Sequence, residues 1–141
     1  MPYIVDKSVM VSVWKEFDMN SAKFLIKVHE TCERVFATDT MQALYKRLLK
    51  EVEERQRYGP TLLNSLQLYL LWKETKKVQI ILTSTLTPVD GEEEVEDEDR
   101  EFIRLAKVTG AILVTYDKKL LKLASILGYQ AAKPSDLLQK P

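Results

Sequence analysis

Three aspartates that are distant in the chain stand beside apolar segments in a pattern that suits a metal site. Asp6 ends the apolar stretch YIV, and Asp117 follows the apolar run AILVT after one intervening residue. Because open α/β sheets bind ligands at the carboxyl ends of their strands, these two carboxylates can share one sheet edge. Asp99 opens a predicted helix that leads into the second of these strands. Converging carboxylates suit Mg²⁺ or Mn²⁺, and such a site can activate water against a phosphodiester.

Each of these carboxylates also has a purely structural interpretation. Asp117 can cap the helix that follows it, and Asp6 can cap a helix that starts near Ser8. Asp97 and Asp99 can complement the positive end of the helix that they open. For any one of these aspartates alone, the structural role is favoured. The three together favour a metal site, because two stand at strand ends of one sheet and the third at the start of a helix that leads into it.

Other catalytic chemistries have little support in the sequence. His29 is the only histidine, and in the segment HETCE a glutamate, Glu33, takes the place of the second histidine of a zinc-binding H-E-x-x-H motif. We expect Cys32 to be a buried core thiol and not a nucleophile. The four glycines are too scattered for a phosphate-binding loop. The chemistry is therefore expected from the carboxylates.

The segment 99–117 carries two of the three aspartates. Its apolar residues recur at helical spacing from Phe102 to Val108, and Gly110 predicts the end of that helix. The run AILVT is continuously apolar, as is typical of a strand in a parallel sheet with both faces covered. The unit of helix, turn and strand thus begins at Asp99 and ends at Asp117.

The same patterns predict alternating strands and helices along the rest of the chain. Asp18 or Asn20 is the expected cap of the second helix. Strands are expected at 2–5, 34–38, 78–83 and 111–115, with a short one near 129–132, and helices at 8–17, 17–32, 40–57, 60–77, 99–109 and 118–128, with a last helical turn after 133. This alternation predicts a three-layer α/β/α fold with a central parallel sheet, in a single domain over residues 1–141.

The composition is that of a globular protein with unevenly distributed charge. Of the 141 residues, 45% are hydrophobic and 30% are charged. A single cysteine rules out an internal disulfide and favours the cytoplasm, and no apolar stretch is long enough to span a membrane. Residues 90–99 hold eight of the 21 acids and no base, so we expect a solvated acidic loop over 90–98. The remaining surplus of bases is compatible with a polyanionic partner.

The chain resembles the PIN-domain family, the nuclease fold of VapC-type toxins and of several RNA-processing enzymes. The resemblance rests on IVDKSVMVS, EDEDREFIRLAKVTGAILVTYDKKLLKL and GYQAAKPSDLL, and it covers most of the chain. PIN domains show an aspartate shortly before an apolar helix, then a small-residue turn, a strand, and T-x-D followed by a leucine-rich helix. Asp99, Thr115 and Asp117 fit that order, and Asp6 fits the first motif of the family.

This resemblance implies a metal-dependent endoribonuclease that hydrolyses single-stranded RNA. Asp6, Asp99 and Asp117 would be ligands of Mg²⁺ or Mn²⁺, directly or through water, with Asp97 as a further candidate. Thr115 would support the site by hydrogen bonding. The resemblance also implies RNA as a partner, a homodimer and, for a toxin, an antitoxin protein, with no membrane association.

The sequence departs from the family pattern in three places. Lys7 stands where a small polar residue is usual, and Lys119 where many members carry a further aspartate. The glutamate that is usual early in the helix after the second strand is absent, because Leu44 or Ala43 occupies its place. Asp39, at the end of that strand, is the best-placed substitute, although capping the helix is its expected role.

Two other functions stay open. The missing glutamate favours a PIN-fold module that binds RNA or protein with weakened or absent catalysis. An α/β domain of the phosphatase or receiver type would instead use Asp6 as a nucleophile that accepts a phosphoryl group. That second alternative fits the first motif but not the T-x-D block.

Overall fold

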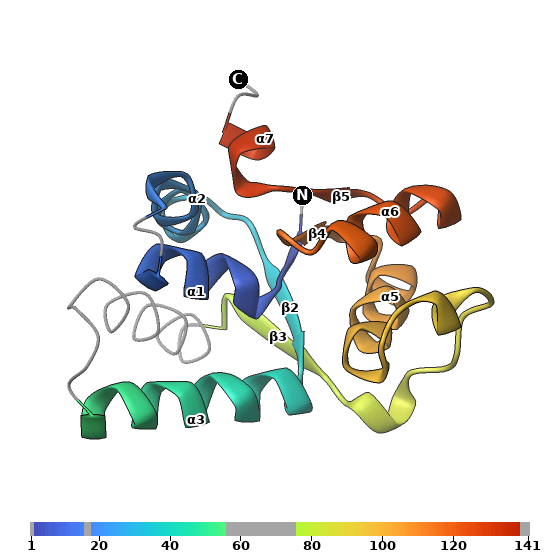
Figure 1. The fold of residues 1–141 in the computed structure, drawn as a ribbon, viewed down its shortest axis with the longest axis horizontal. Coiled ribbons are helices and arrows are strands. Elements are labelled where there is room, and N and C mark those ends of the chain that lie inside the picture. The colour runs from blue at the N-terminus through green and yellow to red at the C-terminus, as the bar shows by residue number, and fades with distance from the viewer. Residues whose placement is uncertain (1, 16–17, 56–75, 139–141) are drawn as a thin grey trace.

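The computed structural model describes residues 2–15, 18–55 and 76–138, which form an α/β fold in three layers (Figure 1). The helix expected at 60–77 lies almost entirely outside the described residues. The strands are β1 (Tyr3–Val5), β2 (Val35–Thr38), β3 (Val78–Ile81), β4 (Ile112–Val114) and β5 (Ala131–Ala132). The helices are α1 (Lys7–Lys15), α2 (Met19–Glu30), α3 (Asp39–Arg55), α5 (Asp97–Thr109), α6 (Lys118–Leu127) and α7 (Pro134–Leu138), with 3₁₀ turns η1 (Thr83–Thr85) and η2 (Glu92–Glu94).

The five strands form one parallel sheet in the order β3-β2-β1-β4-β5. In its centre, β1 pairs with β4 from Tyr3 opposite Ile112 to Val5 opposite Val114. The predicted α/β class with a central parallel sheet is therefore confirmed. The chain crosses from β3 at one edge to β4 on the far side of β1, so the order of strands reverses between β1 and β4.

Helices cover both faces of the sheet. The helices α1, α2 and α3 lie on one side and α5 and α6 on the other, as right-handed crossovers require when the strand order reverses (Figure 1). Every residue of β1 and β4 is buried, which explains why both strands are continuously apolar in the sequence. The carboxyl ends of these two central strands are thereby held in a packed frame.

Helix ends follow the expected chemistry closely. Asp18 caps α2 by accepting the N–H groups of Asn20 and Ser21 at 3.0 and 3.4 Å, so it is the correct one of the two predicted caps. Gly110 ends α5 in the left-handed conformation, with φ of 69°, as predicted. Helix α1 begins at Lys7, so that only Asp6 separates it from β1. This direct junction fixes Asp6 between two regular elements.

Two expectations about individual residues are wrong. The acidic segment is not solvated throughout, because Glu92 is 6% exposed, accepts the N–H of Val89 at 3.0 Å and pairs with the guanidinium of Arg104. Cys32, expected in the core, is exposed in the loop after α2. Among the described residues, no helix has the length and apolar character needed to cross a membrane.

Replacing Glu92 with glutamine is expected to make the fold less sensitive to acid. The hydrogen bond from Arg104 lowers the pKa of Glu92 from 4.5 to about 2. The stability that ionised Glu92 gives the fold is therefore complete above about pH 4.5 and is lost as the pH falls toward 2. Melting temperatures should fall more steeply with acid for the native protein than for Glu92→Gln. The exposed neighbour serves as the control, since Glu93→Gln should follow the native curve; parallel curves for native and Glu92→Gln proteins would contradict the expectation.

Candidate metal centre

The ends of β1 and β4 lie side by side at the point where the strand order reverses. In open α/β sheets the crevice outside the carboxyl ends at such a point is the usual ligand site. Asp6 directly follows β1, and its N–H donates to the carbonyl of Val114 in β4 at 3.0 Å. Asp117 follows the end of β4 and precedes α6. Both aspartates therefore lie at the carboxyl ends of the two central strands.

Asp6 is nearly buried, and two hydroxyl groups fix its carboxylate. Its Oδ2 accepts hydrogen bonds from Ser8 Oγ at 2.9 Å and from Thr115 Oγ1 at 2.7 Å. Ser8 Oγ in turn accepts the N–H of Tyr116 at 3.1 Å. Within the described part of the chain, Oδ1 of Asp6 takes no hydrogen bond, so this oxygen is available to a ligand.

Thr115 also positions Asp117. The N–H of Asp117 donates to Thr115 Oγ1 at 3.1 Å, so one buried hydroxyl contacts both aspartates. Oδ1 of Asp117 accepts the N–H groups of Lys119 and Leu120 at 2.9 and 3.3 Å. Asp117 thus caps α6 with one oxygen, and its carboxylate also shares a side-chain hydrogen bond with that of Asp99. The structural and the functional interpretation of Asp117 are compatible.

Helix α5 brings Asp99 to the same edge. Burial, followed by the negative charges of Asp117 and Asp6, raises the pKa of Asp99 from 3.8 to about 6. Asp99 lines one cavity with Asp6 and another with Asp117, and it shares a side-chain hydrogen bond with Asp117, so its carboxylate lies close to both. The structure therefore brings together the three aspartates that the sequence singles out.

The donor set suits a hard cation, although it is not preassembled around one. Among the residues that the structure describes, no group of three or more His, Cys, Asp or Glu side chains has the arrangement needed to hold a metal ion. Mg²⁺ keeps several of its waters and needs only one or two direct carboxylates, so a looser cluster can still bind it. Such an ion would use Oδ1 of Asp6 and the neighbouring carboxylates of Asp99 and Asp117, and it would displace the hydrogen bond that those two share.

The other candidate acids do not join the cluster. Asp97 is 90% exposed and pairs with Arg100 at 2.8 Å, so it points to solvent and not to the three carboxylates. Asp39 accepts the N–H and the hydroxyl of Thr83 at 2.7 and 2.8 Å, and these bonds lower its pKa. Asp39 therefore links α3 to the segment after β3 and does not replace the missing glutamate.

Two cavities meet at the carboxylates, and Asp99 lines both. One, of about 260 Å³, is lined mainly by α3 and α5 and includes Asp6. The other, of about 400 Å³, lies between the acidic loop and the start of α6 and includes Asp117. Leu44 lines the first cavity and Ala43 does not. Among the described residues of α3, those that line this cavity are Thr40, Met41, Leu44 and Arg47, so this wall carries no carboxylate.

A tether that holds the loop between β4 and α6 could not be predicted from the sequence. The hydroxyl of Tyr116 donates to the carboxylate of Asp18 and lies 3.1 Å from the hydroxyl of Ser21. Burial and the bond to Asp18 raise the pKa of Tyr116 to about 12, so the hydroxyl stays a donor at neutral pH. Since Tyr116 stands between Thr115 and Asp117, this contact with α2 fixes both. A tyrosine between two polar residues gives no local signal of such a role.

Replacing Thr115 with valine is expected to weaken the fold and the site together. Thr115 is fully buried, and valine would remove the donor to Asp6 and the acceptor for the N–H of Asp117. The loss should be about 1–3 kcal/mol in the free energy of unfolding, measured by urea denaturation. Thr115→Ser keeps the hydroxyl and should retain most of this stability. Equal losses in the two variants would mean that the methyl group, and not the hydrogen bonding, matters.

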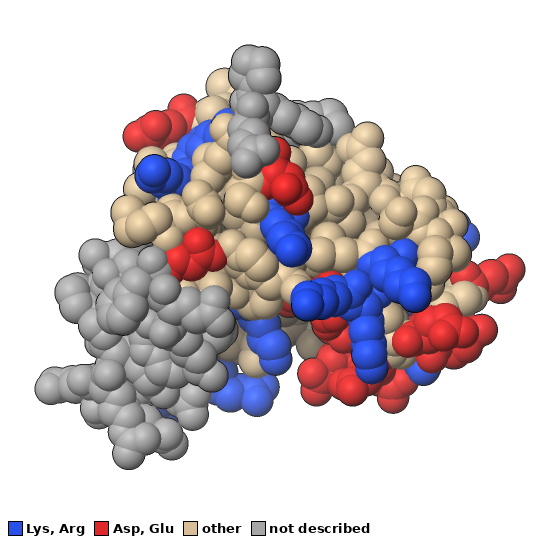
Figure 2. All heavy atoms as spheres, turned by 45° about the horizontal axis from the view of Figure 1, so that its top comes forward, with Lys and Arg blue, Asp and Glu red and all other residues tan. Residues whose placement is uncertain are grey.

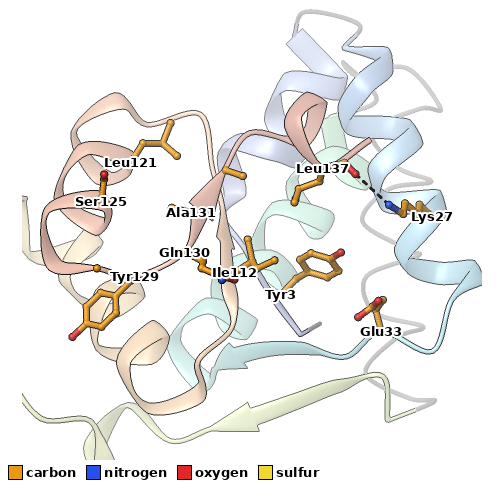
Figure 3. Close-up of a pocket in the computed structure, with 12 residues that line it drawn as sticks. Tyr3, Lys27, Glu33, Ile112, Leu121, Ser125, Tyr129, Gln130, Ala131 and Leu137 are labelled. Atoms are coloured by element: carbon orange, nitrogen blue, oxygen red, sulfur yellow. Dashed lines mark hydrogen bonds between the residues drawn. The ribbon is translucent and has the colours of Figure 1, made fainter. Parts of the chain in front are cut away.

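A larger cavity, of about 650 Å³, lies at the amino ends of the central strands and lacks this chemistry (Figure 3). Tyr3 and Ile112 line it from β1 and β4. Its charged side chains are Lys27 and Glu33, and Lys27 Nζ already donates to the carbonyl of Leu137 at 3.2 Å. With a single carboxylate among its lining residues, this cavity is not a metal centre of the predicted kind.

Comparisons with known proteins support the fold alone. No family model and no curated protein matches the chain. The chain is similar to a solved structure described as the crystal structure of PAE2754 from Pyrobaculum aerophilum, with a TM-score of 0.53 and 19% identity, over 98% of this chain and 86% of that chain. At this identity the likeness extends to the α/β architecture and to no activity.

Proposed function

We propose that this protein is a metal-dependent ribonuclease of the PIN-domain type, acting on single-stranded RNA with Mg²⁺ or Mn²⁺. The observation that carries the proposal is the meeting of Asp6, Asp99 and Asp117 where the strand order reverses. Burial, and then repulsion from the charges of Asp117 and Asp6, raises the pKa of Asp99. A divalent cation would relieve that repulsion. The resemblance of the segments around these aspartates to PIN motifs supplies the class of reaction.

Each residue has a distinct task in this proposal. Asp6, Asp99 and Asp117 would hold the ion, which when bound activates a water molecule and neutralises charge on the phosphate. Thr115 and Ser8 orient the carboxylate of Asp6 by donating to its Oδ2. The first N–H groups of α6 hold Asp117 in place.

Cleavage of an end-labelled single-stranded RNA with Mn²⁺, compared between the native protein and Asp117→Asn, tests the proposal. Asparagine keeps an oxygen that can cap α6, so the variant should fold while it loses an anionic ligand. We expect cleavage that EDTA abolishes and a rate at least about 100-fold lower for the variant, since even residues behind metal ligands contribute 10- to 100-fold. Equal rates would identify a contaminating nuclease and contradict the proposal.

A PIN-fold binding module without catalysis is the second candidate, and Leu44 favours it. Leu44 lines the cavity beside Asp6 and Asp99, and a site with fewer anionic ligands binds cations more weakly. RNA that binds the native protein with Mn²⁺ and stays intact would support this module. A phosphoryl-accepting Asp6 has less support, because that side chain is 6% exposed and two hydroxyls occupy its Oδ2.

The partners follow from the resemblance alone. We propose RNA as the substrate, a homodimer as the assembly, the cytoplasm as the compartment and, for a toxin, a cognate antitoxin protein. Light scattering after size-exclusion chromatography measures the assembly directly, and a mass of 16.3 kDa would contradict the dimer.

A further inference from the structure

Helix α6 presents a cationic face directly beside the candidate metal centre. Lys118, Lys119 and Lys122 are exposed and follow Asp117 within two helical turns. Residues three and four positions apart share one side of a helix, so these lysines form one surface, called here the α6 lysine face. Within the described part of the chain none of the three forms an ion pair. Lys119 also lines the 400 Å³ cavity that contains Asp117.

Two further cations lie on the other side of the carboxylates. Lys7, the first residue of α1, and Arg47, on α3, are both exposed and line the 260 Å³ cavity that contains Asp6, together with Glu98 and Glu101 of α5. Asp99 lines both cavities, so it lies between this pair and Lys119 of the α6 lysine face. A polyanion that touches both groups of cations must therefore pass over the carboxylates.

The acidic loop restricts the route further. Glu93, Glu94 and Glu96 line the second cavity together with Lys119, and they are called here the acidic rim. The ion pair of the adjacent Glu92 with Arg104 holds the rim in place. Figure 2 shows Asp and Glu side chains gathered along one edge of the molecule, with a group of Lys and Arg directly beside them. Repulsion from the rim would direct a polyanion onto the lysines.

We infer that one RNA strand crosses the centre from Lys7 and Arg47 to the α6 lysine face, with the scissile phosphate over the carboxylates. The nature of the polyanion rests on the proposed function; the route rests on the positions of the cations. The first cavity also has apolar walls, from Met41, Leu44 and Phe102, against which a base can pack. A base can enter such a cavity only when it is unstacked, which selects a single strand.

Binding of a fluorescein-labelled 12-nucleotide oligouridylate, followed by anisotropy in EDTA, tests the route without cleavage. The triple variant Lys118→Gln, Lys119→Gln and Lys122→Gln should bind at least about tenfold more weakly at low salt. Each phosphate contact of a single strand contributes about 0.7 to the slope of log affinity against log salt, so three contacts should reduce that slope by about 2. Native affinity and slope in this variant would overturn the inference.

A second triple variant removes the same amount of positive charge near the amino ends of the strands, away from the three carboxylates. Arg34, Lys76 and Lys107 are exposed and stand ahead of β2, β3 and β4. Their replacement by glutamine should leave affinity and slope at native values, and an equal loss in both triples would overturn the inference. The route and the nuclease activity can fail separately. If the native protein cleaves RNA but the α6 triple variant binds it as tightly as the native protein, only the route is wrong. If the α6 triple variant loses binding but the native protein does not cleave RNA, only the catalysis is wrong.

The acidic rim provides an independent arm of the test. Neutralising Glu93, Glu94 and Glu96 together to glutamine should tighten binding of the same oligonucleotide several-fold at low salt, because the rim repels it. The gain should disappear when the α6 lysines are also neutralised, since the rim acts by directing the strand onto them. A gain of equal size in both backgrounds would overturn the role given to the rim.

Discussion

Replacing Asp99 with asparagine is expected to stabilise the metal-free protein and to abolish cleavage. Burial and the charges of Asp117 and Asp6 raise the pKa of Asp99 to about 6, so ionised Asp99 destabilises the fold. Protonated Asp99 stabilises the fold instead, and this contribution is complete below pH 3.8, the ordinary pKa, and is lost as the pH rises through 6. At pH 7.5 in EDTA the variant should melt about 3 °C higher, which corresponds to roughly 1 kcal/mol after solvent screening at this half-buried position.

The same variant should lose its response to metal. Mn²⁺ at 100 times its Kd would stabilise the native protein by about 2.7 kcal/mol, and Asp99→Asn should show little of this gain. Cleavage should fall at least about 100-fold, as for a lost metal ligand. Asp97→Asn is the matched control, because it removes the same charge from a 90% exposed position on the same helix. It should behave like the native protein, whereas a full Mn²⁺ response in Asp99→Asn would contradict the account.

Introducing glutamate at position 44 is expected to strengthen metal binding. Leu44 lines the cavity that contains Asp6 and Asp99, so Leu44→Glu would add a fourth carboxylate to the centre. The affinity of hard cations rises with the number of charged ligands, and we expect the Kd for Mn²⁺ to fall at least about tenfold, with faster cleavage. In EDTA the additional repulsion should lower the melting temperature. Isothermal titration calorimetry and thermal melts measure these opposite effects.

The neighbouring position provides the control for this gain. Ala43 is exposed and does not line the cavity, so Ala43→Glu adds the same charge to the same helix without reaching the centre. It should leave the affinity for Mn²⁺ unchanged. Equal improvement in both variants would reveal a general effect of charge. Improvement by Ala43→Glu alone would mean that α3 presents the other side to the carboxylates.

The positions of the three aspartates could be predicted because local patterns determine where their elements begin and end. The apolar runs that form β1 and β4 are short and continuous, so the ends that carry Asp6 and Asp117 are clear in the sequence. The glycine that ends α5 and the acids that open it define the helix that carries Asp99. A parallel sheet then places all three at one edge, whatever the side-chain detail.

Contacts between distant segments account for what the sequence could not show. Tyr116 and Asp18 are 98 positions apart, and nothing in either segment indicates that they meet. Glu92 stands among exposed acids, and its burial depends on Arg104 of α5. The exposure of Cys32 likewise follows from the position of its loop and not from its residue type. Such features require the packed fold, because they depend on where helices lie relative to one another.

Anomalous diffraction from crystals soaked in Mn²⁺ at about pH 7.5 would show whether the three carboxylates bind one metal ion. We expect one strong anomalous peak between Asp6, Asp99 and Asp117, with oxygens of at least two of them at about 2.0–2.2 Å from the ion. The same soak of Asp99→Asn crystals should give a peak of much lower occupancy. A native structure whose carboxylates contact only neighbouring N–H and hydroxyl groups, with manganese bound elsewhere or nowhere, would contradict the account.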